Sequence, residues 1–439
     1  MLPVYILLTA ASLILSRRLY HTVLSPIGIF GAIWNGLLTL FEARLLNYDP
    51  LNSLAHAAFI GSFLLFVGGV LMATVLALPF KYEESPIPAL NLRRMRHVLD
   101  LLNALSLLGL LLRVFQLIRL VGVGATLNTM TFRGNVAEMG TGEFGGGLVG
   151  YSLALLPLAG IVGGIYLAEH PSGRLRGLSC LVISAGSSLL TGSRALFIWT
   201  LLLFAAAYVL TRVIVQRQPA SRVLRPLAAA GAGLFLVFAI VGTLRRAEFA
   251  PLQESEVNVR LPRPVLQAYH YMTSGFGAFS VHIKDPVQID LPGIHTIQPL
   301  VRAIARLIPK RKGFSYEFLV HYSTQRDFVS IPQATNVFTY LAAFFDDLGW
   351  AGILGMSLVI GFLSGFTFQK LYTQSGFKMI ALYSLFCLQF MFASISPITN
   401  FNSILLTILG VFVLNPYLSR KEDPDENLLP VADASGGPR

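Results

Sequence analysis

Long apolar runs separated by short polar segments dominate the chain. A helix needs roughly 20 mostly apolar residues to cross the hydrocarbon core of a bilayer, which is about 30 Å thick. The runs lie at residues 2–15, 22–41, 54–79, 98–120, 148–168, 177–192, 195–214, 226–243, 350–369, 379–395 and 403–418. The pattern therefore predicts an all-α polytopic integral membrane protein with about eleven transmembrane helices.

The longest polar interruption follows the eighth run and divides the chain. Residues 1–243 form an expected eight-helix transmembrane region, 244–349 a large loop, and 350–418 a three-helix transmembrane region. Residues 419–439 are polar and rich in Pro, Gly and acidic side chains. Such a composition buries too little apolar surface to fold, so we expect a disordered tail.

The end of the large loop, residues 336–349, has the periodicity of a short amphipathic helix. Its residues fall on two arcs at helical spacing. The polar arc contains Asn336, Thr339, Tyr340, Ala343, Asp346 and Asp347, and the apolar arc contains Val337, Phe338, Leu341, Phe344, Phe345 and Leu348. Because this helix is too short to cross a bilayer, we expect it to lie at the interface or to re-enter the membrane.

Positive charge is distributed unequally between alternate loops. The loops at 16–22, 80–97, 169–176, 212–225 and 370–378, with the tail, contain 17 Lys and Arg residues, whereas the alternate short loops contain 3. Cytoplasmic loops carry the excess of Lys and Arg. We therefore expect a cytoplasmic C-terminus, with the N-terminus and residues 244–335 outside, and we read the first apolar run as a retained span.

Composition excludes several classes of function. The chain is 54% hydrophobic and 13% charged, and its net charge of +11 lies mainly beside apolar runs, so nucleic acid is not an expected partner. Cys180 and Cys387 lie in apolar runs and build no disulfide framework. The histidines match no metal motif, and there is no glycine-rich nucleotide fingerprint or Walker A sequence. We expect no metal and no cofactor.

Arginines recur where apolar runs leave the membrane on the predicted outer side. They are Arg194 in the TGSR turn at 191–194, Arg245 and Arg246 after the eighth run, and Arg133 in the loop after the fourth run. The planar guanidinium binds phosphate oxygens bidentately and keeps its charge, which suits a lipid-linked diphosphate. The alternative is that these side chains extend to lipid headgroups.

Arg113 differs because it lies within the fourth run. An ionisable residue at that depth faces a wet cavity or a partner. We expect it either to contribute to a substrate site or to pair with an acidic side chain on a neighbouring helix.

Asp346 and Asp347 lie at the C-terminal end of the predicted amphipathic helix. Negative charge there opposes the helix dipole, which is an unusual choice for stability alone. A carboxylate so placed could act as general base toward a sugar hydroxyl. The alternative is that one of the two caps the following span, whose apolar run begins at Trp350.

Three stretches resemble the Wzy-type oligosaccharide repeat unit polymerases, which are membrane glycosyltransferases of bacterial surface polysaccharide synthesis. They are TGSRA at 191–195, YHYMTSGFGAFS at 269–280, and NVFTYLAAFFDDLGWAG at 336–352. The last is similar to the family's Asn-Val-aromatic-Thr segment that ends in Asp-aromatic-Gly, although Leu348 stands at the usually aromatic place. The positions that match family motifs are Arg194, Asn336 and Asp347.

The resemblance implies a GT-C-like membrane enzyme of the bacterial inner membrane. Its donor and acceptor would be undecaprenyl-diphosphate-linked oligosaccharides, in contact with membrane lipids and a chain-length regulator. Arg194 and Arg245 would stabilise the leaving diphosphate, and Asp347 would act as the base of an inverting, metal-independent transfer. The expected substrate-binding residues are Arg246, Arg133, Arg113, Asn336, Tyr340 and His270.

Two other functions stay open. A ligase that transfers a finished glycan to another acceptor would share the fold and the arginines. A flippase or exporter of the lipid-linked oligosaccharide would be expected to show repeat symmetry, charges at the membrane midplane and broken helices in matching halves.

The charge asymmetry predicts the topology, which cysteine labelling tests. In intact spheroplasts, a membrane-impermeant thiol reagent should label Phe249→Cys but not Ser435→Cys, because the two residues lie in the predicted outer loop and the cytoplasmic tail. Permeabilised cells should label both, which controls for reactivity. Labelling of position 249 only after permeabilisation would overturn the topology.

Overall fold

A computed structural model of the chain describes residues 1–77, 90–128, 147–191, 195–223, 258–259, 262–284, 295–297, 300–301, 329–331, 333–335, 337–374 and 376–419. These residues form a helical bundle with one antiparallel β-hairpin, β1 (Val329–Ile331) and β2 (Gln333–Thr335), in which Ser330 pairs with Ala334. The predicted all-α membrane class is confirmed at this level, since helices dominate the described part of the chain.

Most helices follow the apolar runs, whereas α11 lies within the predicted large loop and α14 begins before its predicted run. The helices are α1 (Leu2–Tyr20), α2 (Pro26–Glu42), α3 (Ser53–Ala77), α4 (Leu92–Asn128), α6 (Gly147–Leu153), α7 (Leu156–Glu169), α8 (Arg174–Thr191), α9 (Ala195–Leu210), α11 (Arg263–His282), α14 (Tyr340–Gln374), α15 (Phe377–Phe392) and α16 (Asn402–Leu418). Three short turns join them, namely η2 (Pro171–Gly173), the π-helical η3 (Thr211–Val215) and η6 (Ile398–Asn400).

Six stretches of the described residues are long and apolar enough to cross a membrane: Leu2–Tyr20, Ser53–Leu76, Leu92–Gln116, Val149–Glu169, Ala195–Val215 and Tyr340–Gln374. The apolar helices α2, α15 and α16 are shorter. The predicted run at 226–243 lies outside the described residues, so the total of eleven spans stays a prediction.

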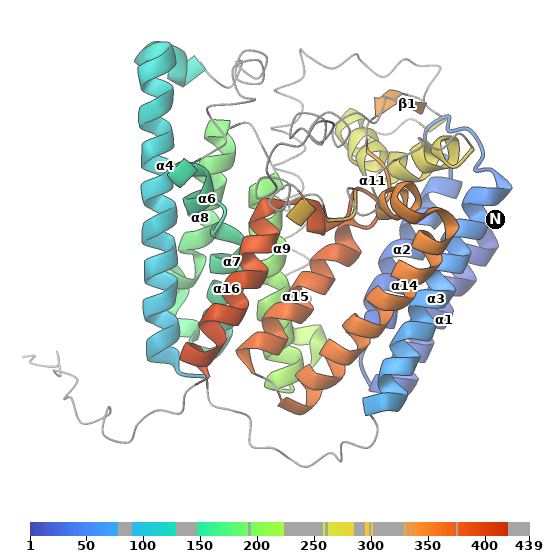
Figure 1. Ribbon diagram of the computed structural model, residues 1–439, viewed down its shortest axis with the longest axis horizontal. Helices are drawn as coiled ribbons and strands as arrows, with labels where there is room; N and C mark the ends of the chain where they lie inside the picture. Colours follow the sequence, from blue (N-terminus) through green and yellow to red (C-terminus); the bar gives the residue numbers. More distant parts are fainter. Residues whose placement is uncertain are drawn as a thin grey trace, which may run out of the picture.

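The bundle has two groups of helices. Figure 1 shows α1, α2, α3 and α14 side by side in one group and α4, α6, α7 and α8 in the other, with α15 between them. Helix α11 lies across one end of the first group. We call this end of the bundle the α11 end.

Hydrogen bonds join described segments at two opposite ends of the bundle. At the α11 end, Asn52 donates from its backbone N–H to Ser280 Oγ (3.0 Å), and the backbone N–H of Tyr340 donates to the Ala393 carbonyl (2.9 Å). At the opposite end, the Gln216 amide donates to the Ala168 carbonyl (3.2 Å). The grouping matches the two sets of loops that differ in charge, while the side that faces the cytoplasm stays a prediction.

Glycines let two pairs of parallel helices touch backbone to backbone. In the α3–α14 pair, a Cβ at Gly361 would overlap the Phe66 carbonyl oxygen, and one at Gly69 would overlap the Leu358 carbonyl oxygen. In the α7–α9 pair, a Cβ at Gly160 would lie 2.6 Å from the Thr200 carbonyl oxygen. Small residues allow such close approach where lipid gives no hydrophobic drive for helix association. These glycines therefore fix the register of both pairs.

We predict that Gly361→Ala destabilises the protein, whereas Gly355→Ala does not. A Cβ at 361 meets the backbone of α3, and overpacking of this kind costs about 1–3 kcal/mol. A Cβ at Gly355, in the same helix, has no neighbour within 4 Å, and alanine favours helix more than glycine does. Thermal unfolding in detergent measures both variants. Equal melting temperatures of the two variants would show that close packing of Gly361 against α3 does not contribute to the stability of the protein.

Candidate functional site

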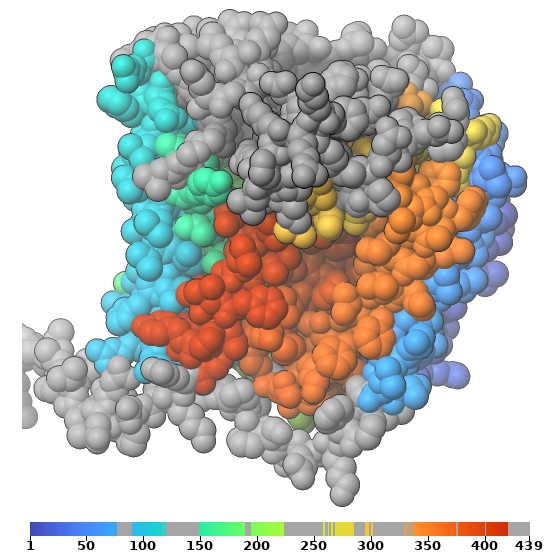
Figure 2. Space-filling model, in the orientation of Figure 1, coloured from blue at the N-terminus to red at the C-terminus, as the bar shows by residue number. Residues whose placement is uncertain are grey.

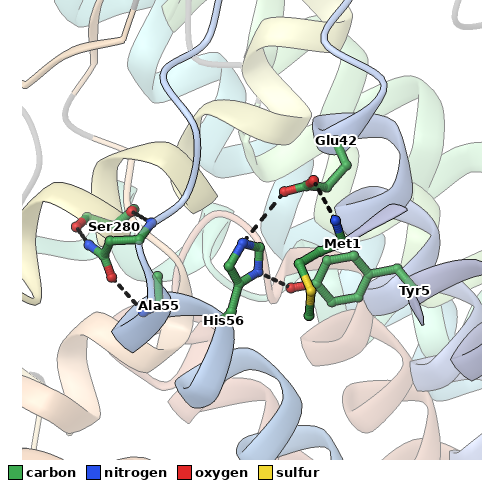
Figure 3. Close-up of polar contacts among 7 residues, drawn as sticks. Met1, Tyr5, Glu42, Ala55, His56 and Ser280 are labelled. Carbon is green, nitrogen blue, oxygen red and sulfur yellow. Dashed lines mark hydrogen bonds and ion pairs between the residues drawn. The ribbon is translucent and has the colours of Figure 1, made fainter. Parts of the chain in front are cut away.

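Helix α11 is fixed to the connection between α2 and α3. The Tyr269 hydroxyl donates to the Leu40 carbonyl at 2.9 Å, and Ser280 contacts Asn52 through both its hydroxyl and its carbonyl. Figure 3 shows the Ser280 contacts beside the start of α3. Burial raises the pKa of Tyr269 to about 12, so its hydroxyl stays a donor at physiological pH. The helix is therefore a fixed support for the residues at its C-terminal end.

A second set of polar contacts ties the helices beneath α11. The Tyr5 hydroxyl pairs with His56 Nδ1 at 2.7 Å, and Glu42 Oε1 lies 3.8 Å from His56 Nε2. Figure 3 shows these three side chains converging from α1, α2 and α3. They hold the ends of the three helices together at the α11 end.

Helix α14 is bent close to its start. Gly349 has φ 59° and ψ −143°, a conformation that side-chain-bearing residues rarely adopt. The bend separates a short segment, 340–348, from the long segment that runs beside α3. The bend is tight, since a Cβ at Gly352 would overlap the Phe344 carbonyl oxygen. Asp346 and Asp347 lie just before the bend and face the protein interior.

The short segment differs from the expected interfacial helix. It begins at Tyr340 rather than at residue 336, and residues from both predicted arcs are buried, among them Tyr340, Leu341, Ala343 and Phe344. The Tyr340 ring packs on Trp34, with ring centroids 5.3 Å apart. Neighbouring helices thus cover the arc that we expected to face the interface, and Tyr340 has a packing role rather than the predicted substrate contact.

Asp346 forms a buried pair with a histidine of α11. Asp346 Oδ1 lies 2.5 Å from His282 Nε2, and the two side chains are 2% and 7% exposed. The rings of Phe338 and Phe345 lie 5.5 Å and 6.3 Å from the imidazole. A carboxylate that contacts one imidazole nitrogen fixes the orientation of the ring. The pair therefore holds the His282 ring in one position beside Asp347.

Asp347 contacts a different part of the chain. Its Oδ1 accepts the His295 N–H (3.1 Å), and its Oδ2 accepts the N–H (2.8 Å) and the hydroxyl (2.5 Å) of Thr296. The Thr399 hydroxyl in turn donates to the Thr296 carbonyl at 2.6 Å. The carboxylate therefore ties α14 to the turn at 295–297, and through it to η6. These bonds do not cap the segment that begins at Trp350.

We call His282, Thr296, Asp346, Asp347 and Thr399 the carboxylate cluster. The two aspartates are adjacent in sequence, yet their surroundings differ. Asp346 has an ionisable partner, whereas both oxygens of Asp347 accept hydrogen bonds from a turn. This arrangement suits Asp346 and His282 for proton transfer and Asp347 for positioning.

The other predicted site residues are only partly brought together. His270 lies on α11, where its Nδ1 is 3.2 Å from the Tyr48 hydroxyl, and Arg113 lies half-buried on α4 in the other group of helices. Arg133, Arg194, Arg245, Arg246 and Asn336 lie outside the described residues. Of the aromatic residues in the 269–280 stretch, Tyr269, Phe276 and Phe279 are buried, whereas Tyr271 is 53% exposed.

Sequence reasoning missed the roles of Thr296, Thr399 and His282. His282 lies 64 positions before Asp346 in the chain, so the sequence around either residue does not identify the other as its partner. The threonines carry no motif. Only covariation between such distant positions could have indicated these contacts.

Comparison of the chain with protein-family models, curated proteins and solved structures gives no match. The described residues also contain no group of three His, Cys, Asp or Glu side chains placed to hold a metal ion. Function is therefore argued from the carboxylate cluster and its position in the bundle.

We predict that Asp347→Asn loosens the turn at 295–297. An amide has one acceptor oxygen and turns an N–H group toward a donor, so hydrogen bonds to a charged group, each about 1.5–3 kcal/mol, are lost. Hydrogen exchange of the peptide that contains His295 and Thr296 should accelerate. Asp100→Asn is the matched control, because it breaks an exposed ion pair with Arg176 at the opposite end of the bundle. Exposed ion pairs contribute at most about 1 kcal/mol, so exchange of the same peptide should not change in this variant. Unchanged exchange in Asp347→Asn would contradict the positioning role.

Proposed function

We propose that the protein is a GT-C-like membrane glycosyltransferase that polymerises undecaprenyl-diphosphate-linked oligosaccharide repeat units on the outer face of a bacterial inner membrane. The observation that carries the proposal is the buried His282–Asp346 pair beside Asp347 at the α11 end. The charge asymmetry predicts that this end faces outward. The predicted phosphate-binding arginines lie outside the described residues, and the charge pattern predicts that they face the same side of the membrane.

The proposed reaction needs a base and a stabilised leaving group. The acceptor sugar hydroxyl attacks the anomeric carbon of the donor glycan, the bond from that carbon to the diphosphate oxygen breaks, and the hydroxyl proton passes to the base. We assign the base to His282, oriented by Asp346, in place of Asp347, whose oxygens hold the 295–297 turn. Arg194 and Arg245 would neutralise the departing diphosphate. The displacement is inverting and needs no nucleotide sugar and no metal.

The shape of the bundle supports a lipid-linked substrate. Figure 2 shows the surface hollowed between α14 and α16, where α15 lies deeper. Leu363 on α14 and Leu409 and Phe412 on α16 are apolar side chains exposed on these two helices. We propose that the isoprenoid chain occupies this groove from the side, which would place its diphosphate toward the α11 end.

One experiment separates the polymerase from the ligase and the flippase. Purified protein, given only undecaprenyl-diphosphate-linked repeat units and no nucleotide sugar, should lengthen the glycan and release undecaprenyl diphosphate. A ligase would leave the repeat units unextended until a separate acceptor is added. Translocation of the carrier in vesicles without extension would replace the proposal by a flippase.

We predict that three variants lose turnover for two different chemical reasons. His282→Gln should lower the turnover number about 100-fold or more, since loss of a general base commonly costs that much. Arg194→Ala and Arg245→Ala should do so by removing a charge-stabilising donor, at a similar cost. His97→Gln and Asp100→Asn, both on α4 near the opposite end, are the controls and should keep wild-type rates. Full turnover of a folded His282→Gln variant would remove the base assignment.

A further inference from the structure

Among the buried side-chain N–H donors of the described residues that have no acceptor, two lie on α9 and α15. They are Nε1 of Trp199 on α9 and Nε2 of Gln389 on α15, in side chains that belong to residues 6% and 9% exposed. A buried donor without a partner is costly and calls for an explanation such as a bound ligand. The acceptor side of Gln389 is used, since its Oε1 accepts the Ile398 N–H at 2.9 Å.

Both donors lie against the same turn between α15 and α16. The Trp199 ring packs on Phe401, with centroids 4.3 Å apart, and on Phe392 at 6.3 Å. Phe392 is one helical turn after Gln389, and Gln389 itself holds the N-terminal end of η6. The two N–H groups thus come from different helices that meet at one place.

This place adjoins both halves of the proposed site. Thr399, within η6, is hydrogen-bonded to Thr296 and so connects the turn to Asp347. On the other side, α9 begins at Ala195, directly after Arg194, and Trp199 is roughly 6 Å further along that helix. The junction of α9, α15 and η6 is therefore connected to the carboxylate cluster through Thr399 and Thr296.

We propose that Trp199 and Gln389 bind phosphoryl oxygens of a polyprenyl diphosphate. The inference rests on the proposed function and extends it, because it assigns the carrier's headgroup to the α9–α15–η6 junction. Phosphoryl oxygens accept hydrogen bonds, as these two N–H groups require, and they would complete the hydrogen bonding of both side chains. Neutral donors fixed by packing hold the headgroup in place without adding further charge to the membrane interior.

Two near-isosteric variants test the assignment. Trp199→Phe removes the N–H and keeps an aromatic ring against Phe401. Gln389→Glu keeps an acceptor for the Ile398 N–H and replaces the donor by a second oxygen, which repels phosphate. Each should weaken the binding of undecaprenyl diphosphate in detergent, measured by calorimetry, by roughly tenfold or more. Trp350→Phe and Gln374→Glu make the same chemical changes at exposed positions of α14 and should bind normally.

The stability of the ligand-free protein separates binding from folding. Trp199→Phe should stay folded and melt near the wild-type temperature, because the removal of an unpaired buried donor offsets part of the packing that the smaller ring loses. Undecaprenol, which has no phosphate, should bind both variants as well as the wild type. If both variants bind undecaprenyl diphosphate as tightly as the wild type does, the two N–H groups do not contact the headgroup and the proposal is overturned. If the variants lose as much affinity for undecaprenol as for undecaprenyl diphosphate, the site binds the isoprenoid chain instead of the phosphate, and the proposal is also overturned.

The outcome is independent of the polymerase test. If the wild type binds undecaprenyl diphosphate through these residues but extends no glycan, the headgroup site stands and the polymerase proposal falls. If the glycan is extended while both variants keep normal affinity, only the headgroup site falls.

Discussion

Direct backbone contact between α3 and α14 is the interaction on which the candidate site depends. Lipid provides no hydrophobic drive to bring two apolar helices together, so their association relies on close packing. Gly69 and Gly361 remove the side chains that would keep the two backbones apart. Because α14 also carries Asp346 and Asp347, the register of this contact sets where the two carboxylates meet α11 and the 295–297 turn. A shift along α3 would move both aspartates away from their partners.

The apolar pattern predicted much of the fold. The length of the runs is a physical requirement of the bilayer, and most of the observed helices follow them, including the separation of α8 from α9. The topology that the charge asymmetry indicates stays a prediction. What the pattern could not predict is which helices touch. The spacing of Gly160 with Gly164, and of Gly361 with Gly365, is a signal for close helix contact that becomes meaningful only once the parallel pairs are known.

The candidate site was predicted less completely, for a reason visible in residues 336–349. Periodicity separates polar from apolar residues on a helix, but it does not say what covers each arc. Here Phe30 and Trp34 of α2 pack on Tyr340, so this residue of the polar arc belongs to the core. The adjacent aspartates were recognised as unusual, yet their different roles depend on His282 and Thr296, which are distant in sequence.

The parallel arrangement of α3 and α14 also has a consequence for biogenesis. The two helices cross in the same direction, yet Gly69 is synthesised long before Gly361. At ordinary translation rates the delay is roughly 15–60 s. During that interval the glycine face of α3 has no partner from its own chain, and the hydroxyl of Ser62, fully buried in the finished bundle, is not yet enclosed by later helices. The N-terminal helices therefore have to persist in the membrane as an incomplete intermediate, and the last third of the chain completes the packing of a helix inserted near its beginning.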